Sequence, residues 1–148
     1  MLDAPCCDLD ARVEAGAGRS ISSIFATDGE AAFRMLEQRA MAVALNQPPQ
    51  VIAAGAGWAA EPGNLAAAEL RALIIYLSTD PADAAHRLRG DQSRPLLGGT
   101  DLEQRLGELL TRRESWYRLA ALEVAVGRST PELAAAAVVT AARQYGGW

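Results

Sequence analysis

Short apolar runs alternate along the chain with stretches of helical periodicity. The runs that predict strands are Ala4–Asp8, Gln50–Gly55, Ala72–Ser78 and Leu122–Val126. Val51–Ala54 and Leu73–Leu77 are continuously apolar, which is typical of parallel strands that helices cover on both faces. The alternation therefore predicts an α/β fold with a mainly parallel sheet, in which these two strands are central or nearly central.

Capping residues and apolar stripes predict four helices. The best-defined one begins after Thr27-Asp28 and ends near Leu45. Its apolar stripe, which we expect to face the sheet, comprises Phe33, Leu36, Ala40, Val43 and Ala44. The other helices begin at Asp80-Pro81, at Thr100-Asp101 and after Ser129-Thr130-Pro131.

Two glycine-rich segments are candidates for ligand-binding loops. Residues 55–63 follow a predicted strand, and open α/β sheets bind ligands at the carboxyl ends of their strands. Residues 90–99 are polar and contain Arg94-Pro95, so they predict either a mobile lid or a solvated connector.

Composition limits the classes of function. The chain has 148 residues, half of them apolar, which suits one domain over residues 1–148. The net charge of -4 and pI near 5.0 argue against broad binding to nucleic acid or to an anionic membrane. The sequence shows no signal peptide, spanning apolar run or lipidation signal, so we expect a location in the reduced cytoplasm.

Reactive residue types are few. All 14 basic residues are arginine, which excludes lysine Schiff-base chemistry, although a GC-rich coding bias is the simpler explanation of that composition. Cys6 and Cys7 are adjacent and point to opposite faces of a strand, so they suit neither a disulfide nor a metal site. The single histidine, His86, lies in a helical stretch and is expected to be exposed.

Charged side chains cluster at three places. Asp8-Leu9-Asp10 ends the first predicted strand, where alternation places both carboxylates on one side to address a ligand or cation; capping of a helix is the alternative. Glu30, Arg34 and Glu37 share one helix face, so they form either an internal ion pair or a solvated charged face. Arg113 lies in a charged segment for which a solvated face is the simpler interpretation.

Several of these features recur together in one known family. Those near the N-terminus are Asp8-Leu9-Asp10, Gly18-Arg19-Ser20-Ile21, Ile24–Glu30, Phe33-Arg34 and Glu37. Those further along are Gly55-Ala56-Gly57 at a strand end, Arg94-Pro95-Leu96-Leu97 in the candidate lid, and Arg113 with Tyr117. In order and spacing, from Leu2 to the C-terminus, the sequence resembles shikimate kinase.

The resemblance implies a fold and a reaction. The fold is the three-layer P-loop kinase fold of the nucleoside-monophosphate-kinase type. The reaction is ATP-dependent phosphorylation of the shikimate 3-hydroxyl, a step of aromatic amino acid biosynthesis. ATP and Mg²⁺ are the implied cofactors, and a complete protein is expected to be a monomer. By the same resemblance, Asp10 binds the acceptor hydroxyls and assists their deprotonation, and Asp8 lies near the Mg²⁺.

The resemblance also implies a binding site for shikimate or a similar small carboxylate. Arg34 and Arg113 clasp the carboxylate, for which the planar guanidinium fork is suited. Gly55-Ala56-Gly57 present backbone N–H groups to the same substrate, and Arg94 covers the ATP phosphates. Two departures weaken the expectation for shikimate itself. Ala56 replaces the middle glycine of a triple, and Trp58 stands where the family usually has a small residue.

The phosphate loop of the family is expected before Leu2. Its pattern Gly-x-x-x-x-Gly-Lys-Ser/Thr needs a lysine, and this sequence has none. We therefore expect the first strand, the phosphate loop and the first helix to be missing, roughly two dozen residues. Phosphoryl transfer depends on positioning and charge neutralisation by that loop, so the chain alone should be inactive. Exposed strand edges should also make it unstable or dependent on a partner.

Three functions remain open from the sequence. The first is a shikimate kinase whose reading frame begins upstream of Met1. The second is a non-catalytic, carboxylate-binding or regulatory pseudokinase that keeps an anion pocket around Arg34 and Arg113. The third is a related small-molecule kinase with a different acceptor, suggested by Ala56 and Trp58.

Overall fold

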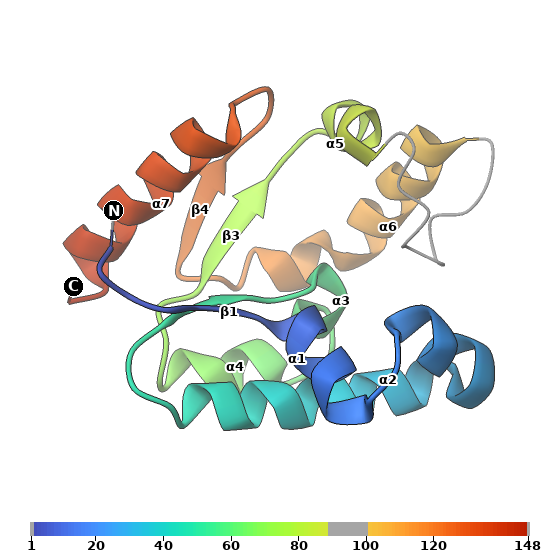
Figure 1. The fold of residues 1–148 in the computed structure, drawn as a ribbon. Coiled ribbons are helices and arrows are strands. Elements are labelled where there is room, and N and C mark those ends of the chain that lie inside the picture. The colour runs from blue at the N-terminus through green and yellow to red at the C-terminus, as the bar shows by residue number, and fades with distance from the viewer. Residues whose placement is uncertain (1, 89–100, 148) are drawn as a thin grey trace. The chain divides into compact units, whose positions relative to one another are not determined.

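The computed structural model describes residues 2–88 and 101–147, and helices and strands alternate along them as predicted (Figure 1). Each strand lies within a predicted run. The strands are β1 (Cys6–Asp8), β2 (Val51–Ala53), β3 (Ile75–Ser78) and β4 (Leu122–Ala125). They form two parallel pairs, β1 with β2 and β3 with β4. Parallel pairing is therefore confirmed, whereas β2 and β3 each have one strand partner among the described residues rather than a central position.

Seven helices lie in the described part of the chain. They are α1 (Leu9–Ala17), α2 (Ile21–Leu45), α3 (Ala56–Ala59), α4 (Asn64–Glu69), α5 (Pro81–Leu88), α6 (Leu102–Tyr117) and α7 (Pro131–Tyr145). The predicted N-caps of α6 and α7 are confirmed, because the Asp101 and Thr130 side chains accept hydrogen bonds from the first turns. The sequence did not predict α1, α3 and α4. No helix in these two described ranges is long and apolar enough to cross a membrane.

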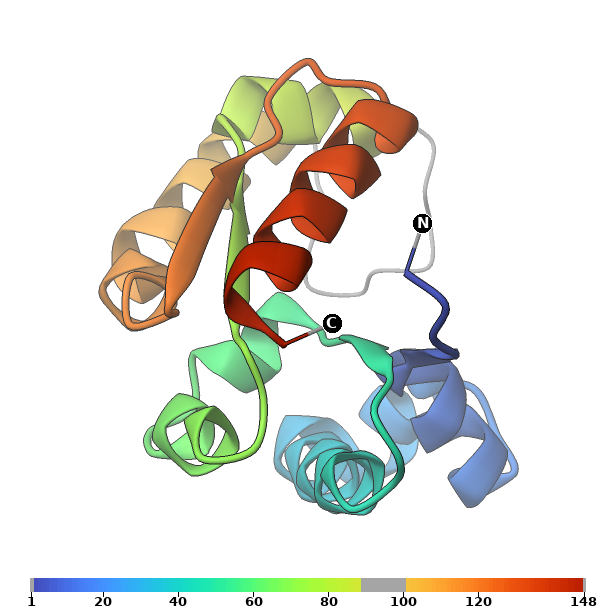
Figure 2. The same ribbon diagram turned by 90° about the vertical axis from the view of Figure 1, so that its left-hand side faces the viewer.

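The chain divides into two compact units, one of residues 3–64 and one that begins at Leu65, and each is described by itself. A single domain over 1–148 stays a prediction. In the second unit, the β3–β4 sheet lies between α7 on one face and α6 on the other (Figure 2). The Arg87 guanidinium of α5 donates to the Val126 and Ser129 carbonyl oxygens at 3.3 and 3.0 Å, which fixes the turn after β4. His86 is exposed, as predicted.

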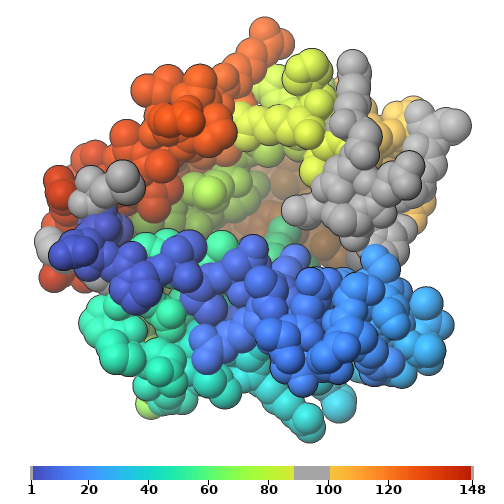
Figure 3. Space-filling view, viewed as in Figure 1, coloured from blue at the N-terminus to red at the C-terminus, as the bar shows by residue number. Residues whose placement is uncertain are grey.

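The first unit begins with β1 and turns at once into a helix. The Asp8 carboxylate accepts hydrogen bonds from the backbone N–H groups of Asp10 and Ala11 at 2.9 and 3.3 Å, so Asp8 is the N-cap of α1. Asp10 therefore lies in a helical turn, and the prediction that strand alternation aligns the two carboxylates is wrong. Within β1, Cys6 is exposed and Cys7 is buried, so their opposite orientations are confirmed. Figure 3 shows α1 and the start of α2 as blue atoms on the surface of this unit.

Helix α2 begins well before the predicted position. Ser20 caps its first segment, and Gly29 interrupts it with φ 81° and ψ 175°, a conformation that favours glycine. The signals at Thr27-Asp28 therefore mark the second segment of a kinked helix. Val13 and Ile24 pack with Phe33 in a buried cluster that joins α1 to both segments.

The buried stripe of the second segment of α2 differs from the predicted one. It comprises Phe33, Glu37, Met41 and Ala44, spaced for one face of a helix. Val43, which we expected on this face, is exposed. The carboxylate of Glu37, which lies outside the predicted stripe, is thus buried on this face.

Candidate functional site

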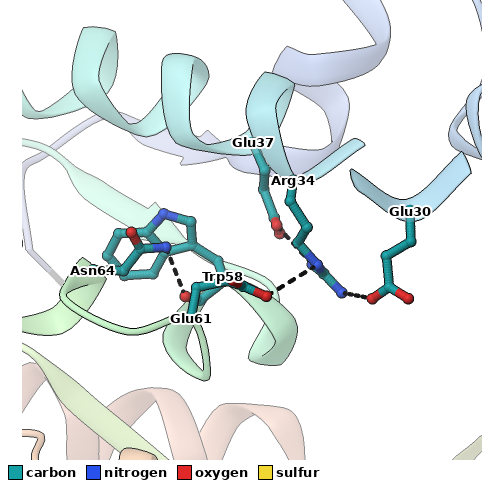
Figure 4. A network of polar contacts seen from close by, with 6 residues as sticks. All are labelled: Glu30, Arg34, Glu37, Trp58, Glu61 and Asn64. Carbon is teal, nitrogen blue, oxygen red and sulfur yellow. Dashed lines mark hydrogen bonds and ion pairs between the residues drawn. The ribbon is translucent and has the colours of Figure 1, made fainter. Parts of the chain in front are cut away.

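The most polar cluster of the first unit surrounds the guanidinium of Arg34 (Figure 4). Arg34 Nη1 donates to Glu37 Oε2 at 2.7 Å, and Nη2 donates to Glu30 Oε1 at 3.0 Å. Both carboxylates belong to the second segment of α2, where residues three and four apart are neighbours. The predicted internal ion pair is therefore confirmed, and it leaves part of the guanidinium fork for other partners.

Glu37 is a buried carboxylate, with 1% of its surface exposed. Burial raises its pKa above the ordinary value of 4.5, and the hydrogen bond and charge of Arg34 offset only part of that effect. The negative charges of Asp10 and Glu61 raise it further. Burial alone would lower the pKa of Arg34, but its hydrogen bonds to Glu37 and Glu30 and their charges outweigh this and hold it above its ordinary value.

Two glycines after β2 let the backbone approach these charges. A Cβ at Gly57 would lie 2.4 Å from Arg34 Nη1 and Nη2, closer than real Cβ atoms come to other heavy atoms. A Cβ at Gly55 would lie 3.0 Å from Glu37 Oε1 and 3.8 Å from Asp10 Oδ1. Asp10, Glu37 and Arg34 therefore meet at one short backbone segment. A side chain at position 57 would displace Arg34, and one at position 55 would crowd Glu37.

The two departures from the family pattern have a structural explanation. Ala56 is exposed in the first turn of α3, and no non-glycine residue in the described ranges has positive φ. Its methyl group therefore does not create the backbone problem expected of an alanine in the middle of the triple. Trp58 is buried, with 6% of its surface exposed, and its carbonyl accepts a hydrogen bond from Asn64 Nδ2 at 2.9 Å. This indole is part of the packing of the segment.

The structure places some of the predicted site residues together. Asp10, Arg34 and the segment 55–57 lie in the unit of residues 3–64. Asp8 is in the same unit, where its carboxylate caps α1. Arg113 lies on α6 in the other unit. Arg94 and the predicted lid of residues 90–99 lie outside the described residues.

Two residues of the cluster were not identified as site candidates from the sequence. Glu37 was noted only as a member of a charged helix face, because a carboxylate is not counted in an apolar stripe. Glu61 lies after α3, and its Oε1 is 3.9 Å from Arg34 Nε. Nothing in the local sequence pattern points Glu61 toward a residue 27 positions earlier.

The donor chemistry of the cluster suits an anion better than a metal. Arg34 supplies planar N–H donors that fit a carboxylate or phosphate. Across the residues that the structure describes, no three His, Cys, Asp or Glu side chains form a group that could hold a metal ion. A magnesium ion shared with a nucleotide needs only one or two protein carboxylates, so a role for Asp8 in magnesium binding stays a prediction.

The raised pKa of Glu37 predicts a pH dependence of stability. The folded chain retains the Glu37 proton above pH 4.5, so this contribution to the free energy of unfolding is fully present below that value. It is lost as pH rises through the folded pKa. Urea unfolding from acid to neutral pH should show this loss in the wild type, and Glu37→Gln should remove it.

Glu69→Gln is the matched control for that experiment, since Glu69 is exposed on α4 and the charge change is the same. Its pH profile should follow the wild type. A Glu37→Gln profile parallel to the wild type would show that the pKa of Glu37 is not raised.

Comparison with known proteins identifies the family of the chain. The family described as "SKI: Shikimate kinase" matches residues 1–143. A shikimate kinase of Caulobacter vibrioides (strain NA1000 / CB15N) is 39% identical over 144 residues, covering 97% of this chain and 72% of the relative. One of Thermobifida fusca (strain YX) is 43% identical over 130 residues, covering 86% of this chain and 74% of the relative.

Solved structures agree as well. "Shikimate kinase from Acinetobacter baumannii in complex with shikimate" has a TM-score of 0.87 and 26% identity, covering 96% of this chain and 80% of that chain. Shikimate kinase from Aquifex aeolicus has a TM-score of 0.78 and 26% identity, covering 97% of this chain and 85% of that one. The α/β fold with parallel strands is thus that of shikimate kinases, and the chain belongs to the shikimate kinase family.

Proposed function

We propose that this chain binds shikimate through Arg34 and supplies the acceptor-binding part of a shikimate kinase. The observation that carries the proposal is the fixed position of the Arg34 guanidinium. It donates a hydrogen bond to buried Glu37, and it lies so close to Gly57 that a Cβ there would be 2.4 Å from its terminal nitrogens. A guanidinium fixed on two sides loses little conformational freedom when it binds a planar carboxylate. The shikimate kinase of Acinetobacter baumannii was solved with shikimate bound, which supports this choice of ligand.

Other predicted residues complete the proposed substrate site. Asp10 would accept a hydrogen bond from the acceptor hydroxyl and assist its deprotonation, since its carboxylate faces Gly55 beside Glu37. Arg113 is proposed as the second arginine for the carboxylate. Backbone N–H groups of Gly55, Ala56 and Gly57 would bind the same substrate.

ATP and Mg²⁺ are the cofactors that the family implies. Mg²⁺ fits the exposed carboxylate of Asp8, a hard oxygen ligand. The ATP phosphates have no comparable cradle in the described residues, because a phosphate loop of this class needs a lysine and the 148 residues contain none. We therefore propose that these 148 residues bind shikimate without phosphorylating it.

Calorimetric titration of the chain with shikimate tests the proposal. The methyl ester, which lacks the carboxylate, should bind about tenfold more weakly or worse, because a charge-assisted contact is lost. Equal affinity for acid and ester, or no binding of either, would contradict a role for Arg34. Formation of shikimate 3-phosphate from ATP and Mg²⁺ by these 148 residues would contradict the absence of turnover.

A protein that carries the phosphate loop ahead of this sequence allows a test of Asp10. Asp10→Asn should lower kcat about 100-fold or more, since a general base contributes factors of that order, with KM for shikimate much less changed. The readout is a coupled assay of ADP release. An unchanged kcat would remove Asp10 from the catalytic role. The upstream reading frame, examined for Gly-x-x-x-x-Gly-Lys-Ser/Thr, shows whether such a form is encoded.

A non-catalytic carboxylate-binding module is the second candidate, because the Arg34 cluster could bind a carboxylate without ATP. It predicts the same shikimate binding but no turnover even when a phosphate loop is added. The third possibility, a kinase with a different acceptor, was suggested by Ala56 and Trp58. It loses support because Ala56 is exposed and Trp58 is buried in the packing of its segment.

A further inference from the structure

Three carboxylates surround Arg34, and one of them differs from the others. Glu30 and Glu37 lie on α2 with Arg34 and accept hydrogen bonds from it. Glu61 comes from the segment after α3, and its Oε1 lies 3.9 Å from Arg34 Nε, within ion-pair range but too far for a hydrogen bond (Figure 4). Arg34 Nε is buried and has no hydrogen-bond partner. This edge of the guanidinium is therefore in a long ion pair with Glu61, and its N–H lacks a hydrogen bond.

The backbone around Glu61 is held in place. The Glu61 N–H donates to the Trp58 carbonyl at 3.2 Å, and the Asn64 N–H donates to the Glu61 carbonyl at the same distance. Asn64 Nδ2 donates to the Trp58 carbonyl as well, and the Trp58 side chain is buried. The Glu61 side chain itself is 41% exposed, so it can rotate into solvent while its backbone stays fixed.

A buried donor without a partner is costly, and a ligand oxygen at Nε would satisfy it. Such an oxygen would enter the space beside Glu61, and two carboxylates at that separation repel. Glu37 and Glu30 each accept one of the two N–H groups of a terminal nitrogen, whereas Nε is the buried nitrogen of Arg34 whose N–H has no partner. An anion oxygen at Nε would therefore gain a new bond with an unsatisfied donor.

We propose that Glu61 competes with anionic ligands for the Nε edge of Arg34 and so sets the affinity of the site for small carboxylates. This inference rests on the proposed binding of shikimate at Arg34. Glu61 swings toward solvent when the ligand carboxylate arrives, and its negative charge weakens binding. Glu61 is a specificity residue rather than a catalytic one. Its negative charge disfavours every anion at Arg34, so only ligands that make enough other contacts in the site bind well.

The test compares wild type, Glu61→Gln and the control Glu69→Gln by shikimate titration, and records the NMR signal of Arg34 Nε–H in each free protein. Glu61→Gln should tighten binding about two- to fivefold at low salt, the range expected for one partly exposed ion pair. The gain should shrink at about 1 M salt, where screening is strong. Glu69→Gln should change neither affinity nor the Nε–H signal.

Each outcome decides between the claims. Unchanged or weaker binding by Glu61→Gln overturns the inference, because Glu61 is then neutral or a favourable ligand contact. An Nε–H signal that is the same in wild type and Glu61→Gln also overturns it. If no protein binds shikimate while the Nε–H signal moves in Glu61→Gln alone, the proposed function fails and the Glu61 contact with Arg34 stands.

Discussion

Gly57→Ala is expected to weaken shikimate binding about 10- to 100-fold, because the displaced guanidinium would lose a hydrogen bond to a charged ligand that is worth about 1.5–3 kcal/mol. The added methyl carbon would stand 2.4 Å from both terminal nitrogens of Arg34, so the guanidinium must move away from the segment after β2. Its hydrogen bonds with Glu37 and Glu30 hold it from the other side, which leaves no small adjustment. Calorimetry with shikimate gives the affinity.

Neighbouring positions supply the controls for this substitution. Gly55→Ala should have a smaller effect, because its methyl carbon would lie 3.0 Å from Glu37 Oε1 and can be relieved by a small shift. Ala56→Gly should leave the affinity close to wild type, since Ala56 is exposed and touches none of these charges. Circular dichroism of each variant checks the fold. A folded Gly57→Ala with wild-type affinity would show that Arg34 does not bind the ligand from this position.

Arg34→Ala is expected to destabilise the chain by about 3–5 kcal/mol at neutral pH, because removing one member of a buried ion pair leaves the other uncompensated. Glu37 is 1% exposed and would lose the hydrogen bond and the positive charge that lower its pKa. The loss of stability should be smaller in acid, where Glu37 is protonated. Urea unfolding at the two pH values measures both effects.

A double variant separates stability from binding. Arg34→Met with Glu37→Leu replaces the pair by apolar side chains of similar size, which often recovers the stability of a broken pair. It should regain most of the free energy of unfolding that Arg34→Ala loses, yet bind no shikimate. Full stability of Arg34→Ala at neutral pH would contradict the burial of the pair, and shikimate binding by the double variant would contradict the site.

The elements with regular patterns were predictable from the sequence. Short apolar runs, two of them continuous, predicted the four strands. Capping residues at Asp101 and Thr130 predicted the starts of α6 and α7. Helix α1 was missed because Asp8 ends a strand and caps a helix at the same residue. The first segment of α2 was missed because Thr27-Asp28 has the residues of a helix start, whereas in the structure Gly29, with positive φ, only interrupts a helix that begins at Ile21.

The site was only partly predictable. Arg34 and Asp10 were predicted from the family resemblance. The structure places both near Gly55 and Gly57, in the compact unit of residues 3–64. The burial of Glu37 was hidden because apolar periodicity ranks a carboxylate as an exposed position. The contact of Glu61 with Arg34 depends on tertiary packing after α3, which no local pattern records.

The most direct test is NMR mapping of shikimate binding on the backbone amides of the wild-type chain. The proposed site predicts that the amides of Gly55, Ala56 and Gly57 shift on titration, together with that of Arg34. The same amides should shift less when the methyl ester is added at equal concentration, because the ester is expected to bind about tenfold more weakly or worse. Shifts confined to other segments, or none at all at saturating shikimate, would contradict the assignment of substrate binding to Arg34.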